Sequence, residues 1–128
     1  MLYFLLLLHF VGDFVFQIRW MANNKSHNQL ALLFHILVYG SILTTGLYFV
    51  MPDSVPVSVF VMFIAFNLVA HYITDAITSK ITSYFYSKQQ IYLFFVTVGF
   101  DQLIHVCTLI LSCQVFLEKI VGVKWLLG

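Results

Sequence analysis

Three short motifs in this sequence place a histidine and an aspartate four residues apart. They are His9-Phe-Val-Gly-Asp13, His71-Tyr-Ile-Thr-Asp75 and Asp101-Gln-Leu-Ile-His105. Residues four apart lie on the same face of an α-helix, so each motif presents an imidazole beside a carboxylate. Imidazole nitrogens and carboxylate oxygens are ligands of zinc, manganese and iron. The repeated spacing therefore indicates a site that collects metal ligands.

The three motifs lie in segments that are otherwise apolar. Three of the five acidic residues and four of the five histidines lie in the four apolar segments of the chain, whereas no lysine or arginine does. Carboxylates in a low-dielectric environment need compensation, or they stay protonated. The candidates for that compensation are protonated histidines or a divalent cation. We expect a divalent metal, with zinc first and manganese or iron as alternatives.

The composition is that of a membrane protein. The 128 residues are 62% hydrophobic and 9% charged, and the mean hydropathy is +0.98. A soluble domain carries about a quarter charged residues. The net charge of +1 provides no basic patch for nucleic acid. The length allows one domain, residues 1–128.

Four apolar segments predict an all-α fold, an integral membrane bundle of four transmembrane helices. The predicted spans are residues 2–18, 29–51, 57–78 and 91–116. The first has no basic region and no small-residue cleavage site, so it is interpreted as a retained span. Residues 23–28 form a polar turn, and residues 79–90 a cytoplasmic loop or short interfacial helix. Residues 118–128 form a short interfacial tail, with Trp125 as an anchor.

Basic residues give an expected orientation. The loops after the first and third spans carry Arg19 with Lys25 and Lys80 with Lys88, whereas the middle loop has none. By the positive-inside rule the first and third loops are cytoplasmic. Two lysines of the tail, Lys119 and Lys124, argue against this orientation.

The polar residues of the four spans are expected at similar depths. At about 1.5 Å per residue, most of them lie about 5–15 Å from the cytoplasmic end of their span, and His105 lies at about 21 Å. The candidate metal ligands are His9, Asp13, His35, His71, Asp75, Asp101 and His105. Two of these have an alternative role: His35 as an interhelical hydrogen-bond donor, and His105 as a residue that orients a ligand.

Other polar residues have supporting roles in this interpretation. Gln17 and Gln102 orient ligands or bind substrate, and Asn67 makes a packing hydrogen bond. Three basic residues at the rim, Arg19, Lys25 and Lys80, would hold an anionic substrate. Two alternatives to a metal site stay open: a hydrogen-bonded histidine–aspartate network, and a proton or ion path.

The combined pattern resembles a known family. It reads His9-x3-Asp13-Phe14-x2-Gln17-x2-Trp20-Met21-Ala22-x2-Lys25, then His35, His71-x3-Asp75-x4-Lys80 and Asp101-Gln102-x2-His105. It resembles the small bacterial and phage membrane proteins classified as domain-of-unknown-function family 3307, over nearly the whole chain. The resemblance implies a four-helix, multi-pass protein of the bacterial inner membrane and brings no established activity. A looser similarity to zinc phospholipase C and P1 nuclease lacks their full ligand set here.

Three functions fit these observations. The first is a metal-dependent hydrolase of a lipid phosphate or similar amphiphile, with Asp101 or Asp75 as general base. The second is transport of a metal ion or a proton. The third is a non-catalytic membrane protein, structural or partner-binding, with the cluster as structural glue. The lipid bilayer is the expected partner, and a homo-oligomer is compatible with each function.

Overall fold

The computed structural model describes residues 2–122, and over this range every regular element is a helix. The all-α prediction is confirmed. The elements are α1 (Leu2–Phe10), the π-helix η1 (Val11–Val15), α2 (Arg19–Asn24), α3 (Gln29–Tyr48), α4 (Val57–Ser87), α5 (Ile91–Ser112) and the π-helix η2 (Cys113–Ile120). The predicted anchor Trp125 lies outside the described residues.

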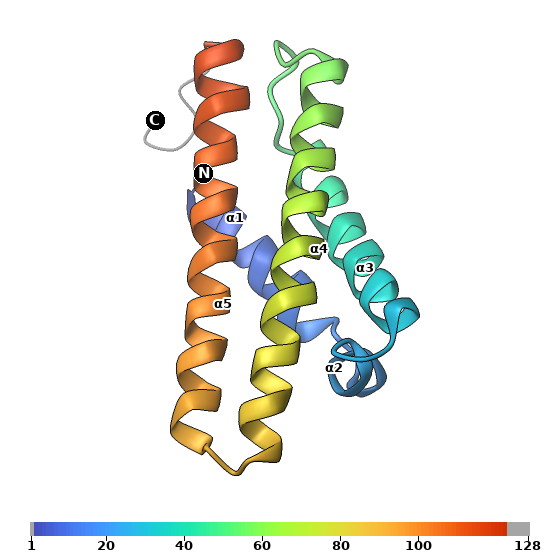
Figure 1. Ribbon diagram of the computed structural model, residues 1–128. Coiled ribbons are helices and arrows are strands. Elements are labelled where there is room, and N and C mark those ends of the chain that lie inside the picture. Colours follow the sequence, from blue (N-terminus) through green and yellow to red (C-terminus); the bar gives the residue numbers. More distant parts are fainter. Residues whose placement is uncertain (1, 123–128) are drawn as a thin grey trace.

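Three helices dominate the fold (Figure 1). They are α3, α4 and α5 with its continuation η2, which have 20, 31 and 30 residues and are long and apolar enough to cross a membrane. In Figure 1, α4 and α5 run side by side and α3 covers one flank of α4. The turn between α4 and α5 uses Gln89, which has a positive φ of 56°.

The N-terminal apolar helix is shorter than predicted. The nine residues of α1 and five of η1 extend about 21 Å, against about 30 Å of bilayer hydrocarbon. The predicted span ran to Ile18, but the backbone of this residue is extended and α2 begins directly after it. In Figure 1 the helix starts at mid-height of the bundle and runs obliquely toward α2. Three described helices therefore meet the length of a span, and the fourth span stays a prediction.

Helix α4 is longer than predicted and continues to Ser87, through the segment interpreted as a loop or separate short helix. That interpretation of residues 79–90 was wrong, because the segment has polar side chains but no proline or glycine to end a helix. The hydroxyls of Thr74 and Thr82 each donate to the carbonyl four residues earlier, at 2.9 and 2.7 Å. Polar side chains thus satisfy their hydrogen bonds within the helix.

Gly12 lets η1 lie close to α3. A Cβ at this position would lie 3.0 Å from Cδ2 and 3.4 Å from Cα of Tyr39. A larger residue would push the two elements apart, because part of the obstacle is backbone. Small residues permit such close helix packing. The contact brings the neighbouring Asp13 against α3.

The core is apolar at the end of the bundle that contains the α3–α4 loop. Its buried members are Leu5, Tyr39, Leu43, Leu47, Val55, Phe63, Leu109, Cys113 and Leu117. One buried polar pair links α4 to α5 nearby. The side-chain amide of Asn67 donates to Ser112 Oγ at 2.9 Å and to the Phe63 carbonyl at 2.8 Å.

We expect Ser112→Ala to destabilise the protein by about 0.5–1.5 kcal/mol, because the variant loses this interhelical hydrogen bond. Denaturation in mixed detergent micelles, followed by circular dichroism, measures the change. Ser41→Ala is the matched control, because the exposed Ser41 hydroxyl bonds only to the Leu37 carbonyl of its own helix, at 2.8 Å. Equal stability losses in the two variants would contradict a specific contribution from the α4–α5 pair.

Candidate metal centre

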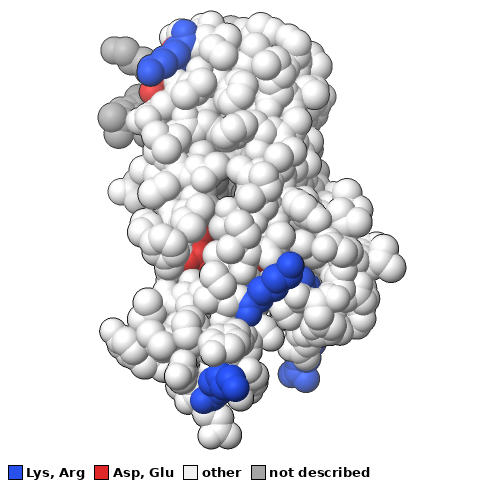
Figure 2. All heavy atoms as spheres, in the orientation of Figure 1, with Lys and Arg blue, Asp and Glu red and all other residues white. Residues whose placement is uncertain are grey.

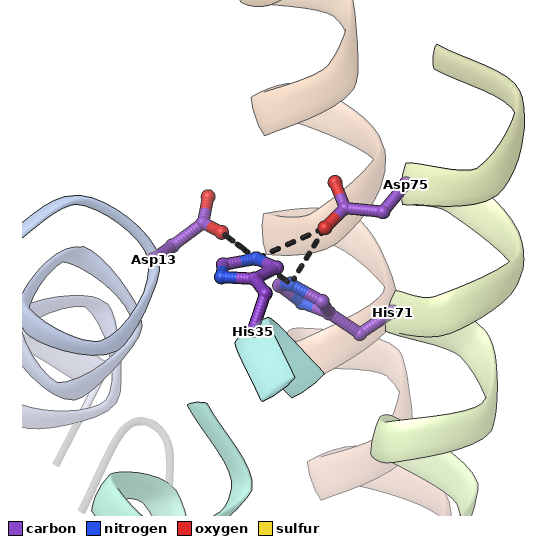
Figure 3. Close-up of side chains that lie close together, drawn as sticks. All are labelled: Asp13, His35, His71 and Asp75. Atoms are coloured by element: carbon purple, nitrogen blue, oxygen red, sulfur yellow. Dashed lines mark hydrogen bonds and ion pairs between the residues drawn. The ribbon is translucent and has the colours of Figure 1, made fainter. Parts of the chain in front are cut away.

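Four donor atoms from three elements meet at one point of the bundle (Figure 3). They are Asp13 Oδ1 from η1, His35 Nε2 from α3, and His71 Nε2 and Asp75 Oδ2 from α4, and we call these four residues the tetrad. His35 Nε2 lies 3.0 Å from Asp13 Oδ1, 2.9 Å from Asp75 Oδ2 and 3.2 Å from His71 Nε2. His71 Nε2 lies 3.4 Å from Asp13 Oδ1 and 3.6 Å from Asp75 Oδ2. All four side chains are buried.

The spacing of these atoms fits a tetrahedral ion. Ligand atoms about 2.0–2.1 Å from a tetrahedral ion lie about 3.3 Å from one another. The five distances above run from 2.9 to 3.6 Å. His35 Nε2 carries at most one hydrogen, yet it has three close polar neighbours. A hydrogen bond accounts for one of these contacts, whereas a cation between the four atoms accounts for all of them.

Neighbouring side chains hold the two histidine rings of the tetrad. The Gln17 side-chain nitrogen lies 3.1 Å from His35 Nδ1 and 3.4 Å from His35 Nε2. With the amide turned by 180°, its oxygen accepts from His35 Nδ1–H and leaves Nε2 free to bind a metal ion. Tyr39 stacks on His71 with ring centroids 4.0 Å apart. Partners of this kind fix the tautomer and the orientation of a metal-binding histidine. The prediction that Gln17 orients a ligand agrees with this contact.

Gln102 connects three other residues of the cluster. Its Oε1 lies 3.0 Å from His9 Nε2, and its Nε2 donates to Asp13 Oδ2 at 2.6 Å and to Asp101 Oδ2 at 3.1 Å. The Thr78 hydroxyl donates to Asp101 Oδ1 at 2.5 Å. Asp101 is therefore held by two donors at the side of the tetrad.

The sequence interpretation missed two residues of this surrounding shell, Thr78 and Tyr39. Thr78 had a signal in the sequence, because it lies three residues after Asp75 and seven after His71 on one face of α4. Tyr39 had a similar signal, because it lies four residues after His35 on α3. Both residues were passed over because they are not metal-ligand types.

Lys25 corrects the expectation that no basic side chain reaches the carboxylates. Its Nζ lies 3.1 and 3.2 Å from the two oxygens of Asp75. The residue lies just before α3, outside any predicted span, and its long side chain extends to the cluster. Three carboxylates and one ammonium leave two negative charges uncompensated among these described residues when the histidines are neutral. A single divalent cation balances them.

A cavity of about 600 Å³ opens beside the tetrad. Its lining includes Asp13, Asp75, Asp101, Lys25 and Gln17, together with hydroxyl-bearing residues of α4. Figure 2 shows acidic side chains within a recess of this face and a basic side chain next to it. The cluster is thus buried in the bundle but accessible from one side.

The remaining candidates divide into two groups. His9 and His105 are buried in the cluster, with His105 ring centroids 5.6 Å from His9 and 4.0 Å from His71. His105 therefore lies at the level of the other histidines, not deeper as its position along the chain suggested. The basic residues Arg19 and Lys80 are not among the residues that line the cavity. The lining of the cavity therefore does not support the prediction that these two residues contact a substrate.

Fold and site together define a class: a helical protein with three helices suited to cross a membrane and a buried histidine–aspartate cluster able to hold a metal ion. The chain belongs to the family described as "Protein of unknown function (DUF3307)", whose model matches residues 1–125. The resemblance inferred from the motifs is confirmed. No curated protein and no solved structure matches the chain.

Proposed function

We propose that the tetrad binds a divalent metal ion, with zinc first, and that the protein is a metal-dependent hydrolase of the bacterial inner membrane. Its substrate would be a phosphate ester at the headgroup of an amphiphile. The observation that carries this proposal is the position of the tetrad: four donor atoms at tetrahedral spacing beside a cavity of about 600 Å³. Pockets for small ligands are typically 300–1,000 Å³ in volume.

The residues divide into metal-holding and proton-accepting groups. Asp13, His35, His71 and Asp75 would hold the ion, which polarises a phosphoryl oxygen and acidifies water to a pKa of about 7. Asp75 was one of two candidate general bases, and its place in the tetrad favours a role as a ligand. Asp101 lies outside the tetrad and lines the cavity. It is the remaining carboxylate that can accept a proton from the attacking water.

In the proposed hydrolysis, Asp101 transfers one proton from water to the leaving alcohol. The water oxygen bonds to phosphorus, and Asp101 takes one of the water's protons. The bond between phosphorus and the alcohol oxygen breaks, and Asp101 returns the proton to the leaving alcohol. Lys25 lines the same cavity, where its ammonium group can attract the phosphate oxygens.

One-sided access favours catalysis over transport. The cavity lies beside the cluster, and its lining extends to Tyr86 and Phe94, on either side of the turn between α4 and α5. The buried apolar residues of the core fill the other end, including Leu43, Leu47 and Leu117. The described residues thus provide a polar entrance from one side and no matching polar exit. A lipid headgroup from the leaflet on the open side can reach such a site.

Hydrolysis by detergent-purified protein tests the proposal. The substrates are a phospholipid and a prenyl phosphate, and the measurements are metal content by elemental analysis and release of the alcohol or of phosphate. We expect about one equivalent or more of a transition metal, and hydrolysis that stops on chelation and returns with added zinc. Folded protein without metal would overturn the metal centre and support a structural hydrogen-bonded network. Metal without hydrolysis, together with metal flux in proteoliposomes, would support transport.

A further inference from the structure

Buried polar atoms without a hydrogen-bond partner are concentrated in the histidine–aspartate cluster. In the described part of the chain, six buried side-chain nitrogen or oxygen atoms have no hydrogen-bond partner. Five of them belong to the cluster, and two of these five have an ion-pair contact: Asp13 Oδ1 lies 3.0 Å from His35 Nε2, and His105 Nδ1 lies 3.6 Å from Asp101 Oδ2. The other three are His9 Nδ1, His71 Nδ1 and His105 Nε2. The sixth is Ser79 Oγ, in the lining of the cavity. Buried polar groups without partners are rare, so this concentration needs a ligand to explain it.

The hydrogen bonds of Gln102 determine which nitrogen of His9 is free. The Gln102 amide nitrogen faces two carboxylates, Asp13 and Asp101, so its oxygen must be the atom that faces His9. That oxygen can only accept, and His9 Nε2 therefore carries the hydrogen. The Nδ1 of His9 is left with a lone pair, is buried and has no partner. A histidine whose other nitrogen donates to a fixed acceptor is arranged as metal-binding histidines are.

His105 completes a second group of donors. Ligand atoms of His9, Asp13 and His105 all lie within 4.8 Å of one another. His105 Nδ1 lies 3.6 Å from Asp101 Oδ2, which leaves His105 Nε2 as the nitrogen free to bind an ion. Asp13 Oδ1 belongs to the tetrad, and Asp13 Oδ2 accepts from Gln102 Nε2 at 2.6 Å. A carboxylate oxygen has more than one lone pair, so Asp13 can hold the ion of the tetrad through Oδ1 and a second ion through Oδ2.

We propose that His9, Asp13 and His105 bind a second divalent cation next to the tetrad, with Asp13 shared between the two ions. This inference rests on the proposed metal centre and extends it to a two-ion site. One divalent ion already balances the three carboxylates and Lys25, so the second adds two positive charges. A phosphate dianion in the cavity would neutralise them. The second ion is therefore expected to bind together with phosphate.

The test is a titration of metal-stripped, full-length protein with Mn²⁺ in the presence of inorganic phosphate, followed by elemental analysis and electron paramagnetic resonance. The wild type is expected to bind two equivalents. Ions that share a carboxylate lie about 3.5–4 Å apart, so the two Mn²⁺ spins should be coupled. His9→Phe and His105→Phe should each bind one equivalent with an uncoupled six-line spectrum. His27→Ala is the matched control, because His27 is exposed in a loop, and it should bind two.

The outcomes separate this inference from the proposed function. One equivalent in the wild type and in both Phe variants would overturn the second position and leave the first intact. No bound metal in any of the proteins would overturn both. Two equivalents without spin coupling would overturn the sharing of Asp13. One equivalent lost in His105→Phe but not in His9→Phe would overturn the donor set proposed here. The wild-type stoichiometry and spectrum decide the question even if a variant fails to fold.

Discussion

Replacement of His35 by alanine is expected to lower the affinity of the tetrad for zinc more than about 100-fold. Loss of a residue that merely supports a ligand costs about 10–100-fold in metal affinity, and loss of a ligand should cost more. His35 Nε2 is the atom with three polar neighbours at 2.9–3.2 Å. Without it, Asp13 and Asp75 face each other with one fewer compensating group. Competition with a chelator of known affinity measures the change.

Two variants make the His35 result interpretable. Gln17→Leu removes the side-chain contacts to the His35 ring but no ligand of the tetrad, and it should lower zinc affinity about 10–100-fold. His27→Ala removes an exposed loop histidine and should leave affinity unchanged. Circular dichroism shows whether the His35 variant keeps its helices. Wild-type zinc affinity in a folded His35→Ala protein would refute the tetrad.

Asp101→Asn is expected to lower kcat for hydrolysis about 10²–10⁴-fold, the range typical of a lost general base. Asparagine keeps an oxygen that can accept from the Thr78 hydroxyl, but it loses the hydrogen bond that Asp101 Oδ2 accepts from Gln102 Nε2. It cannot accept the proton of the attacking water. Because Asp101 lies outside the tetrad, the variant should still bind zinc. Steady-state kinetics and elemental analysis on the same preparation measure the two properties.

The matched control for Asp101 is Asp53→Asn. Asp53 is exposed in the loop between α3 and α4, on the end of the bundle away from the cavity, so activity should be unchanged. An Asp101→Asn protein that hydrolyses substrate at the wild-type rate would exclude Asp101 as the base. An Asp101→Asn protein that loses its zinc would instead identify Asp101 as a ligand.

Local periodicity made the chemistry of the cluster readable from the sequence. A helix repeats every 3.6 residues, so the pairs His9–Asp13, His71–Asp75 and Asp101–His105 had to lie on shared faces. The scarcity of charge in the apolar segments then implied that these faces meet. The all-helical fold followed from the same long apolar runs. These properties depend on residues that are close together in the chain, so they can be predicted from the sequence alone.

Which residues of different helices lie next to one another could be learned only from the tertiary structure. Asp13 reaches α3 because Gly12 lies against Tyr39, and Lys25 reaches Asp75 from outside the predicted spans. The end of the N-terminal helix at Val15 and the extension of α4 to Ser87 also escaped sequence reasoning. Which donors form the tetrad, and which carboxylate lies outside it, depends on how each helix is rotated and how closely it packs. Contacts between residues distant in the chain set those rotations, and hydrophobic periodicity does not encode them.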